Sequence, residues 1–294
     1  MKKYGVIVLL LSCLTFVSYI YLQSDDHEEI KDVYLKTVVF QDEDHDLIPI
    51  SVNLHSEVEL EQEVRNRIEI MKSNDFHSYG LYSVLHPKLE VLSVNRNQQT
   101  LILNVNGYLT SDKQRQLDTL EALTFVLTDY EGINQLQLQV NGKNITHFPS
   151  SSIPVSSLNK DLGLNNFIDT SLSLHETIPV MVYNEKVLND HSYYIPTTIR
   201  VNENDDIKKQ VKTILSHIEE KIHVIDVSLK NGILEVELDS NILLDNENID
   251  QTLEELIILS LSHLQSVKTV NLKINGEDVR THKASIIQYN YIKI

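Results

Sequence analysis

The stretch LQLQVNGKNI, residues 136–145, is followed much later in the chain by a near-copy, VNLKINGEDV, residues 270–279. In both stretches apolar residues alternate with polar residues, a period of two that is typical of a strand with one buried face. Each strand runs into an Asn-Gly pair, Asn141-Gly142 and Asn275-Gly276. Asn-Gly accepts the positive φ angles that a two-residue hairpin turn requires, so these four residues are predicted structural turns. Two such phrases predict an internal repeat.

The similarity extends well upstream of the repeated strand. Leucines at helical spacing predict an amphipathic helix before each copy, and alternating strands precede those helices. The two units align through these pairs of predicted segments: 37–54 with 179–201, 60–71 with 207–218, 89–94 with 222–227, 101–105 with 234–238, and 117–127 with 253–264. Pro49 and Pro196 hold equivalent places in the first pair. The predicted order of strands and helices in each unit is therefore β-β-α-β-β-α-β-β.

This pattern predicts an α+β fold with two tandem repeats. Single-sided alternation in the strands and one apolar stripe on each helix favour, in each repeat, a largely antiparallel sheet with two helices packed on one face. We assign the first domain to residues 33–149 and the second to residues 177–294. The polar, poorly periodic residues 150–176 are predicted to be a linker.

The N-terminus predicts the topology relative to a membrane. Lys2-Lys3 precedes an uncharged run, residues 4–22, that is long enough as a helix to cross the hydrocarbon layer. Lysine on this flank predicts a cytoplasmic N-terminus and an extracytoplasmic bulk, with residues 1–23 as anchor and 24–32 as an acidic spacer. The alternative is a lipoprotein with Cys13 as the lipidated residue. The apolar run continues to Leu22, which favours the anchor.

Composition excludes several classes of protein. The net charge of -17 opposes binding to phosphate backbones, so no nucleic-acid partner is predicted. A single cysteine excludes both a disulfide framework and a cysteine zinc site. No nucleophile–base pair or nucleotide-binding motif stands in the sequence, so we predict no enzyme, no cofactor and no metal.

The densest polar cluster is Asp42-Glu43-Asp44-His45-Asp46. Carboxylates in such a cluster are ligands that Ca²⁺ prefers, but the glycine and the distal glutamate of an EF-hand loop are absent. A solvated loop between two strands is the favoured interpretation.

Two features offer contacts to other proteins. Glu235, Glu237 and Asp239 alternate with apolar residues and form a row on one face of a strand, which suits a basic partner or, alternatively, a solvated surface. The short strands after the Asn-Gly turns, 143–148 and 277–282, offer unpaired backbone groups if they are sheet edges.

A family resemblance rests on residues 123–133, LTFVLTDYEGI, together with the repeated strand and turn. This phrase resembles the end of a GerMN domain, and residues 261–267 keep it more loosely. The resemblance implies a non-enzymatic envelope protein of endospore-forming bacteria, in the space between the mother-cell and forespore membranes. It also implies ring-building-like modules that contact other envelope and sporulation proteins or copies of themselves.

The sequence departs from the family pattern in three respects. Members are typically lipoproteins, and Cys13 is poorly placed for that. The Gly-Pro expected after the first helix is absent. Pro49 to Leu89 also spans more positions than Pro196 to Ile222, so the second repeat lacks a loop. If that loop contacts partners, the two repeats cannot share one partner surface.

The alternative function is binding of a cell-wall polymer. Acidity argues against an anionic polymer as ligand, and the few aromatic residues besides the 13 tyrosines argue against stacking on sugars.

Overall fold

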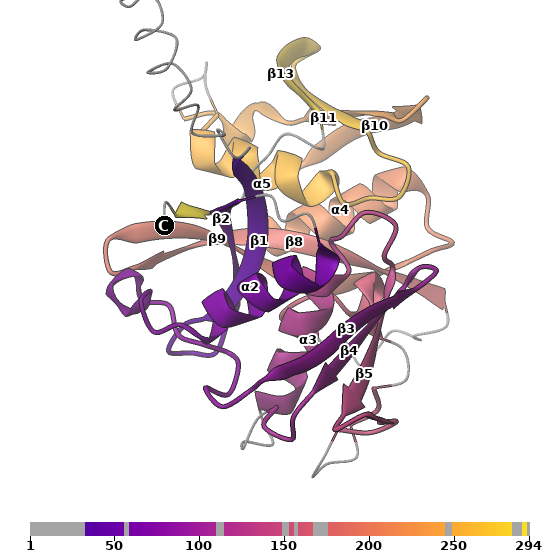
Figure 1. The fold of residues 1–294 in the computed structure, drawn as a ribbon. Coiled ribbons are helices and arrows are strands. Elements are labelled where there is room, and N and C mark those ends of the chain that lie inside the picture. Colours follow the sequence, from indigo (N-terminus) through magenta and orange to yellow (C-terminus); the bar gives the residue numbers. More distant parts are fainter. Residues whose placement is uncertain are drawn as a thin grey trace, which may run out of the picture.

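The structure is a computed structural model that describes residues 33–55, 59–109, 115–148, 153–155, 158–166, 176–244, 249–283 and 290–292. Across these residues the chain is an α+β protein with four α-helices and both antiparallel and mixed sheets (Figure 1). None of the helices in this part of the chain is long and apolar enough to cross a bilayer. The predicted anchor with Cys13 and the predicted acidic spacer lie outside the described residues.

The predicted order β-β-α-β-β-α-β-β is present in both repeats. Repeat 1 contains β1 (Val33–Gln41), β2 (Leu47–His55), α2 (Leu60–Lys72), β3 (Val91–Asn97), β4 (Thr100–Val105), α3 (Arg115–Leu127), β5 (Gln135–Val140) and β6 (Lys143–Asn144). Repeat 2 contains β8 (Thr177–Leu188), β9 (His191–Asn202), α4 (Ile207–Ile218), β10 (Val224–Lys230), β11 (Ile233–Leu238), α5 (Gln251–Leu261), β12 (Thr269–Ile274) and β13 (Glu277–Lys283). The additional short elements are η1 (His77–Tyr79), β7 (Leu158–Asn159), η2 (Lys160–Leu162), η4 (Ser240–Ile242) and β14 (Tyr291–Ile292).

The prediction of one largely antiparallel sheet per repeat was wrong. The first two strands of each repeat form an antiparallel hairpin apart from the other strands of that repeat, β1–β2 and β8–β9, except that the short β14 pairs in parallel with β2. The remaining strands form mixed sheets in which β4 pairs with β5, and β11 with β12, in parallel. The strands of each parallel pair are joined by a helix, and a strand–helix–strand crossover returns the chain in the same direction.

The Asn-Gly turns close the last hairpin of each repeat. Asn141 and Gly142 have φ angles of 49° and 77°, and Asn275 and Gly276 have 53° and 80°. Positive φ at both central residues is the geometry of a type I′ turn.

The helices begin, and bury one face, at most of the positions that the sequence pattern predicts. Asp206 and Asp250 cap α4 and α5, accepting hydrogen bonds from the N–H of Lys209 at 2.8 Å and of Leu253 at 3.0 Å. Leu117, expected on the buried stripe of α3, is 38% exposed, whereas its neighbour Gln116 is buried.

The two hairpins lie in the middle of the molecule, between the two mixed sheets (Figure 1). As a consequence, the core of repeat 1 also contains side chains from later in the chain: Tyr193 and Ile195 of β9 and Ile292 of β14. The two repeats therefore share part of a hydrophobic core, while the division of the chain at residues 149 and 177 stays a prediction.

Candidate functional site: the seam between the two repeats

The outer edges of β2 and β9 lie next to each other where the repeats meet. Pro49 on β2 is opposite Val39 in its hairpin, and Pro196 on β9 is opposite Tyr183, so the prolines occupy equivalent places in the two hairpins. Proline has no N–H, so neither edge has a donor at this point and the two edges cannot form a regular ladder with each other. The donors must come from other parts of the chain.

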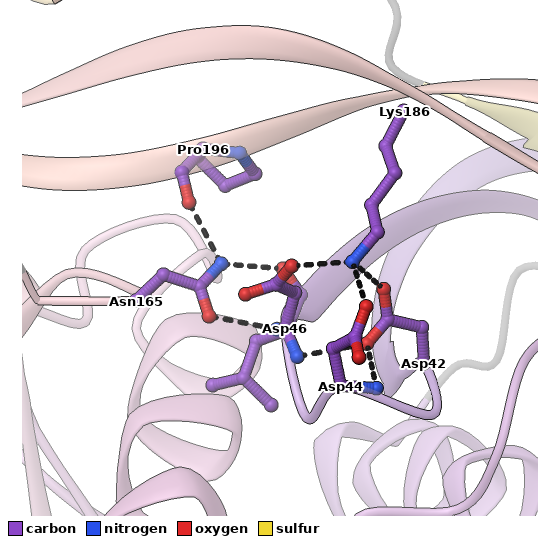
Figure 2. A network of polar contacts seen from close by, with 7 residues as sticks. Asp42, Asp44, Asp46, Asn165, Lys186 and Pro196 are labelled. Carbon is purple, nitrogen blue, oxygen red and sulfur yellow. Dashed lines mark hydrogen bonds and ion pairs between the residues drawn. The ribbon is translucent and has the colours of Figure 1, made fainter.

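Asn165, from the segment between the repeats, supplies the first set of bonds (Figure 2). Its Oδ1 accepts a hydrogen bond from the N–H of Leu47 at 2.7 Å. Its Nδ2 donates to the carbonyl oxygens of Leu47 at 2.8 Å and of Pro196 at 2.7 Å. One amide group therefore bonds to β2 of repeat 1 and to β9 of repeat 2.

Asn290, after repeat 2, makes the equivalent set of bonds. Its Oδ1 accepts from the N–H of Tyr194 at 2.7 Å, and its Nδ2 donates to the carbonyl oxygens of Tyr194 at 3.0 Å and of Pro49 at 2.7 Å. Leu47 and Tyr194 each stand two residues before their proline. The two asparagines are thus related by a local two-fold axis, as in the isologous interface of a symmetric dimer.

Backbone bonds extend the two sets. The N–H of Ser51 donates to the carbonyl oxygen of Asn290 at 3.1 Å, and the N–H of Thr198 donates to that of Leu164 at 2.9 Å. Asn165 and Asn290 have φ angles of 51° and 30°, a region that asparagine adopts more readily than most residues with a side chain. We call the outer edges of β2 and β9, with residues 164–165 and Asn290 between them, the seam.

Lys186 on β8 makes an ionic contact across the junction (Figure 2). Its Nζ lies 2.5 Å from Asp42 Oδ2, 3.0 Å from Asp44 Oδ2 and 2.7 Å from Asp46 Oδ2. Asp42 is 2% exposed. Burial lowers the pKa of Lys186, but the hydrogen bonds to the three carboxylates outweigh burial and raise the pKa above its ordinary value.

The prediction that residues 42–46 form a solvated loop between two strands is confirmed for residues 43–45, which are exposed, but not for Asp42. The cation that the three aspartates contact is Lys186 Nζ. Asp42 is buried, and its Oδ1 accepts hydrogen bonds from the N–H groups of Asp44 at 2.9 Å and Asp46 at 3.0 Å. These bonds fold the loop so that the three carboxylates converge on a lysine of repeat 2. The sequence contains no sign of this partner, which lies about 140 residues further along the chain.

The loop that repeat 2 lacks has a structural role. We call residues 73–90, between α2 and β3, the insert loop; the corresponding connection in repeat 2 is residues 219–223. The insert loop receives the tip of the β8–β9 hairpin. Tyr193 Oη donates to the carbonyl oxygen of Tyr79 at 3.0 Å, and the rings of Tyr79 and His191 lie 4.8 Å apart. The insert loop, which only repeat 1 has, thus provides the surface on which the tip of the β8–β9 hairpin packs.

Glu121 on α3 holds the segment that carries Asn165. It is 3% exposed, and its two oxygens accept hydrogen bonds from Asn165 N–H at 2.8 Å and from Asn166 Nδ2 at 2.7 Å. Burial raises the pKa of Glu121 to about 7, although both hydrogen bonds act to lower it.

His263, after α5, is a second titratable group near the junction and is half-buried. Its ring stacks on Tyr183 with 5.5 Å between centroids, and its Nε2 lies 3.1 Å from Tyr183 Oη. Burial lowers the pKa of His263 to about 4, so the imidazole is neutral at physiological pH.

These two groups predict opposite effects of pH on stability. The folded state resists ionisation of Glu121, so its contribution is present below pH 4.5 and is lost as pH rises through about 7. The folded state resists protonation of His263, so its contribution is present above pH 6.5 and is lost as pH falls toward about 4. Each shift corresponds to about 3 kcal/mol. In the natural protein, between about pH 4.5 and 6.5, the contribution of Glu121 to the free energy of unfolding falls as pH rises and that of His263 increases, so the two partly cancel.

Urea unfolding at a series of pH values checks this prediction. Glu121→Gln should give a stability that rises with pH in this window, because His263 then acts alone. His263→Phe should give a stability that falls with pH. Slopes of the same sign in both variants would contradict the assignment, whatever the absolute stability of each variant.

The predicted partner-contact face lies on repeat 2, away from the seam. Glu235 is half-buried and lies 3.4 Å from Lys273 Nζ. Asp239 accepts a hydrogen bond from the N–H of Asn241 at 2.9 Å and caps η4, so it serves a local turn. Glu237 is half-buried beside Glu235 on β11. Glu235 and Glu237 thus lie on β11 and Asp239 directly follows the strand, and the partner contact of these residues stays a prediction.

Asn165, Asn290, Lys186 and Glu121 were missed by the sequence analysis. The equivalent prolines were the one signal of the seam, because they mark an edge without donors at the same place in both repeats. Across the described ranges, no group of three or more histidine, cysteine, aspartate or glutamate side chains has an arrangement suited to a metal ion.

Comparison with known proteins agrees with this architecture. Residues 25–146 match the model of the Germane family, described as sporulation and spore germination. The spore germination protein GerM of Bacillus subtilis (strain 168) is 24% identical over 190 residues, which cover 58% of this chain and 52% of that protein. The match thus spans about half the length of this relative.

A solved structure has the same fold. The tandem GerMN domains of the sporulation protein GerM from Bacillus subtilis superpose with a TM-score of 0.72 at 19% sequence identity, covering 84% of this chain and 92% of that chain. The fold is therefore that of tandem GerMN domains. The family match to repeat 1 and the similarity to GerM point to the same family, and the resemblance seen in the sequence is confirmed.

Proposed function

We propose that this protein is a non-enzymatic, membrane-anchored assembly protein that supports a sporulation or germination complex outside the cytoplasmic membrane. The predicted anchor would hold the N-terminus in the cytoplasm, and contacts with other envelope proteins would do the work. The similarity to GerM and the match of repeat 1 to the Germane family support the biological setting. The observation that carries the proposal is the seam, because it holds two repeats with different surfaces in one fixed arrangement.

The open faces of the two mixed sheets differ in charge. Helix-facing residues of β4 and β11 are buried, and the alternate residues are partly exposed on the opposite face. On repeat 1 this face carries uncharged side chains: Ser93, Asn95, Thr100, Ile102, Asn104, Gln137 and Gln139. On repeat 2 it carries charged side chains of both signs: Asp226, Glu235 and Glu237 together with Lys230 and Lys273. Charge complementarity governs the choice of partner more than raw affinity, so two such faces suit two different neighbours.

Crosslinking in cells tests the proposal. Full-length protein with a photo-crosslinking residue on the open face of repeat 2 would be recovered from growing cells and from cells driven toward sporulation, and its partners identified by mass spectrometry. We expect sporulation-specific envelope proteins in the second sample. Glu237→Lys should reduce their recovery at least several-fold, whereas Asn104→Lys, at the equivalent place on repeat 1, should not. Equal recovery in growing cells, or no specific partner in either sample, would contradict the proposal.

The second candidate function is binding of a cell-wall polymer, and the uncharged face of repeat 1 favours it. Amide side chains offer both donors and acceptors to sugar hydroxyl groups. Co-sedimentation of the purified protein with isolated cell wall discriminates between the two candidate functions. Retention that Gln137→Ala reduces would support wall binding, and a lack of retention would exclude wall binding.

A further inference from the structure

A pocket of about 480 Å³ opens on repeat 1 between the acidic loop, residues 42–46, and the insert loop. Its walls come from the end of β1, residues 42–45 and the insert loop. Repeat 2 has no equivalent of the insert loop, so this pocket belongs to repeat 1 alone. It lies apart from the open sheet faces, and it shares Asp42 with the ionic contact of Lys186.

Gln41 gives the pocket an unused hydrogen-bond acceptor. Its side chain is 1% exposed, and its Nε2 donates to the carbonyl oxygen of Ser83 at 3.2 Å. Its backbone N–H and carbonyl oxygen pair with Tyr82 at 2.9 Å and 2.7 Å, which fixes the residue in the pocket wall. Its Oε1 accepts no hydrogen bond from any described residue. A buried acceptor without a donor costs about 1–3 kcal/mol, so a ligand that donates here would relieve that cost.

The charges around the pocket favour a cation. Glu43 is exposed on the rim, and Asp42 is also in the wall. No lysine or arginine is among the described residues that line the pocket. Lys186 offsets one of the three aspartate charges of the acidic loop, so the region keeps a negative potential.

The remaining walls suit a cation that is planar and carried on an alkyl chain. The rings of His77 and Tyr82 lie 4.8 Å apart, and Tyr82 Oη donates to Glu43 Oε1 at 2.9 Å, which orients the ring beside the carboxylate. Leu85 and Pro87 add apolar surface. A guanidinium group stacks on aromatic rings and donates to two acceptors at once, whereas an ammonium group is a compact, strongly hydrated point charge.

We propose that this pocket binds an arginine side chain presented by a protein partner. The guanidinium group donates to Gln41 Oε1 and to the Glu43 carboxylate, and its alkyl chain lies along Leu85 and Pro87. This inference rests on the proposed function, since it gives a chemical class to one contact of the assembly protein. It also assigns that contact to repeat 1, which alone has the insert loop.

A binding titration of the purified full-length protein tests the proposal. The probe is a fluorescent glycine-rich peptide with one arginine, compared with the same peptide carrying citrulline, which has the same shape and no charge. We expect the arginine peptide to bind at least tenfold more tightly. Glu43→Gln, at an exposed position that leaves folding intact, should weaken binding at least fivefold. Glu131→Gln, an exposed carboxylate away from the pocket, should change it less than twofold.

A second variant and a competition experiment distinguish an arginine side chain from other cationic ligands. Gln41→Leu, where it folds, should remove the remaining preference for arginine over citrulline. Glucosamine as competitor tests an amino sugar as the natural source of the cation, and displacement of the peptide by glucosamine at equal or lower concentration than arginine amide would overturn the proposal. Equal binding of the arginine and citrulline peptides, or no effect of Glu43→Gln, would also overturn it. The crosslinking experiment in cells tests the proposed function separately, so the failure of one proposal can be distinguished from the failure of the other.

Discussion

Replacing Asn165 with glycine is expected to lower the free energy of unfolding by about 4 kcal/mol, a sum over three hydrogen bonds to backbone groups. The side chain bonds to the N–H and the carbonyl oxygen of Leu47 and to the carbonyl oxygen of Pro196. Each buried backbone group left without a partner costs about 1–3 kcal/mol, and entry of water into the gap reduces the sum. Glycine accepts the positive φ of 51° at this position, so the loss reports the hydrogen bonds and not backbone strain.

The same substitution at Asn231 is the matched control. Asn231 is exposed, has a φ of 54° in the turn between β10 and β11, and precedes Gly232. Asn231→Gly should change stability by less than about 0.5 kcal/mol, as exposed substitutions usually do. Urea unfolding at pH 7 compares the two variants, and a loss at Asn165 no larger than the loss at Asn231 would show that the seam bonds do not stabilise the fold.

Because the two asparagines occupy equivalent places about the local two-fold axis, the same effect is expected at Asn290. Asn290→Gly should cost a similar amount, because Asn290 makes the equivalent three bonds. With both asparagines replaced, we expect the single unfolding transition to separate into two, since the bonds that join β2 to β9 are then lost on both sides of the axis. A single sharp transition in the double variant would mean that the shared core, with Tyr193 and Ile195, is sufficient to couple the repeats.

Element order was the part of the fold that the sequence predicted well. Periodicity located the helices and strands, and the Asn-Gly pairs located two turns, because these features depend on neighbouring residues. The direction of β5 relative to β4 was wrong because single-sided alternation does not distinguish a parallel strand in a mixed sheet from an antiparallel one. The better signal was connectivity, since a helix between two strands of one sheet favours a parallel pair.

The seam was not predictable from local patterns. Asn165 lies in a polar segment without periodicity, and its partners on β2 and β9 are far away in the sequence. Helix α3 has buried polar residues, among them Thr119, Glu121 and Thr124, because it is covered on more than one side. An amphipathic stripe indicates the face toward one neighbour, and a second neighbour, here the segment between the repeats, leaves no such pattern.

Replacing Lys186 with methionine is expected to lower the free energy of unfolding by about 3 kcal/mol, because one side of a partly buried ion pair is removed. The change leaves the Asp42 carboxylate buried without a cation and close to Asp44 and Asp46. Breaking a buried ion pair on one side typically costs about 3–5 kcal/mol, and the lower end applies because the Lys186 side chain is 28% exposed and solvent screens the remaining charges. Lys221→Met, which removes an exposed pair with Glu219 at 3.9 Å, should cost less than about 0.5 kcal/mol.

A double-mutant cycle with Asp42→Asn distinguishes the ion pair from simple packing. The amide that this substitution introduces keeps an oxygen that accepts from the N–H groups of Asp44 and Asp46, so the loop retains its fold when the buried charge is removed. Adding Asp42→Asn to Lys186→Met should therefore recover about 1–2 kcal/mol, as expected for residues in direct contact. Additive losses would show that Lys186 stabilises the junction through its alkyl chain alone, and that the three aspartates are not what holds the β8–β9 hairpin against repeat 1.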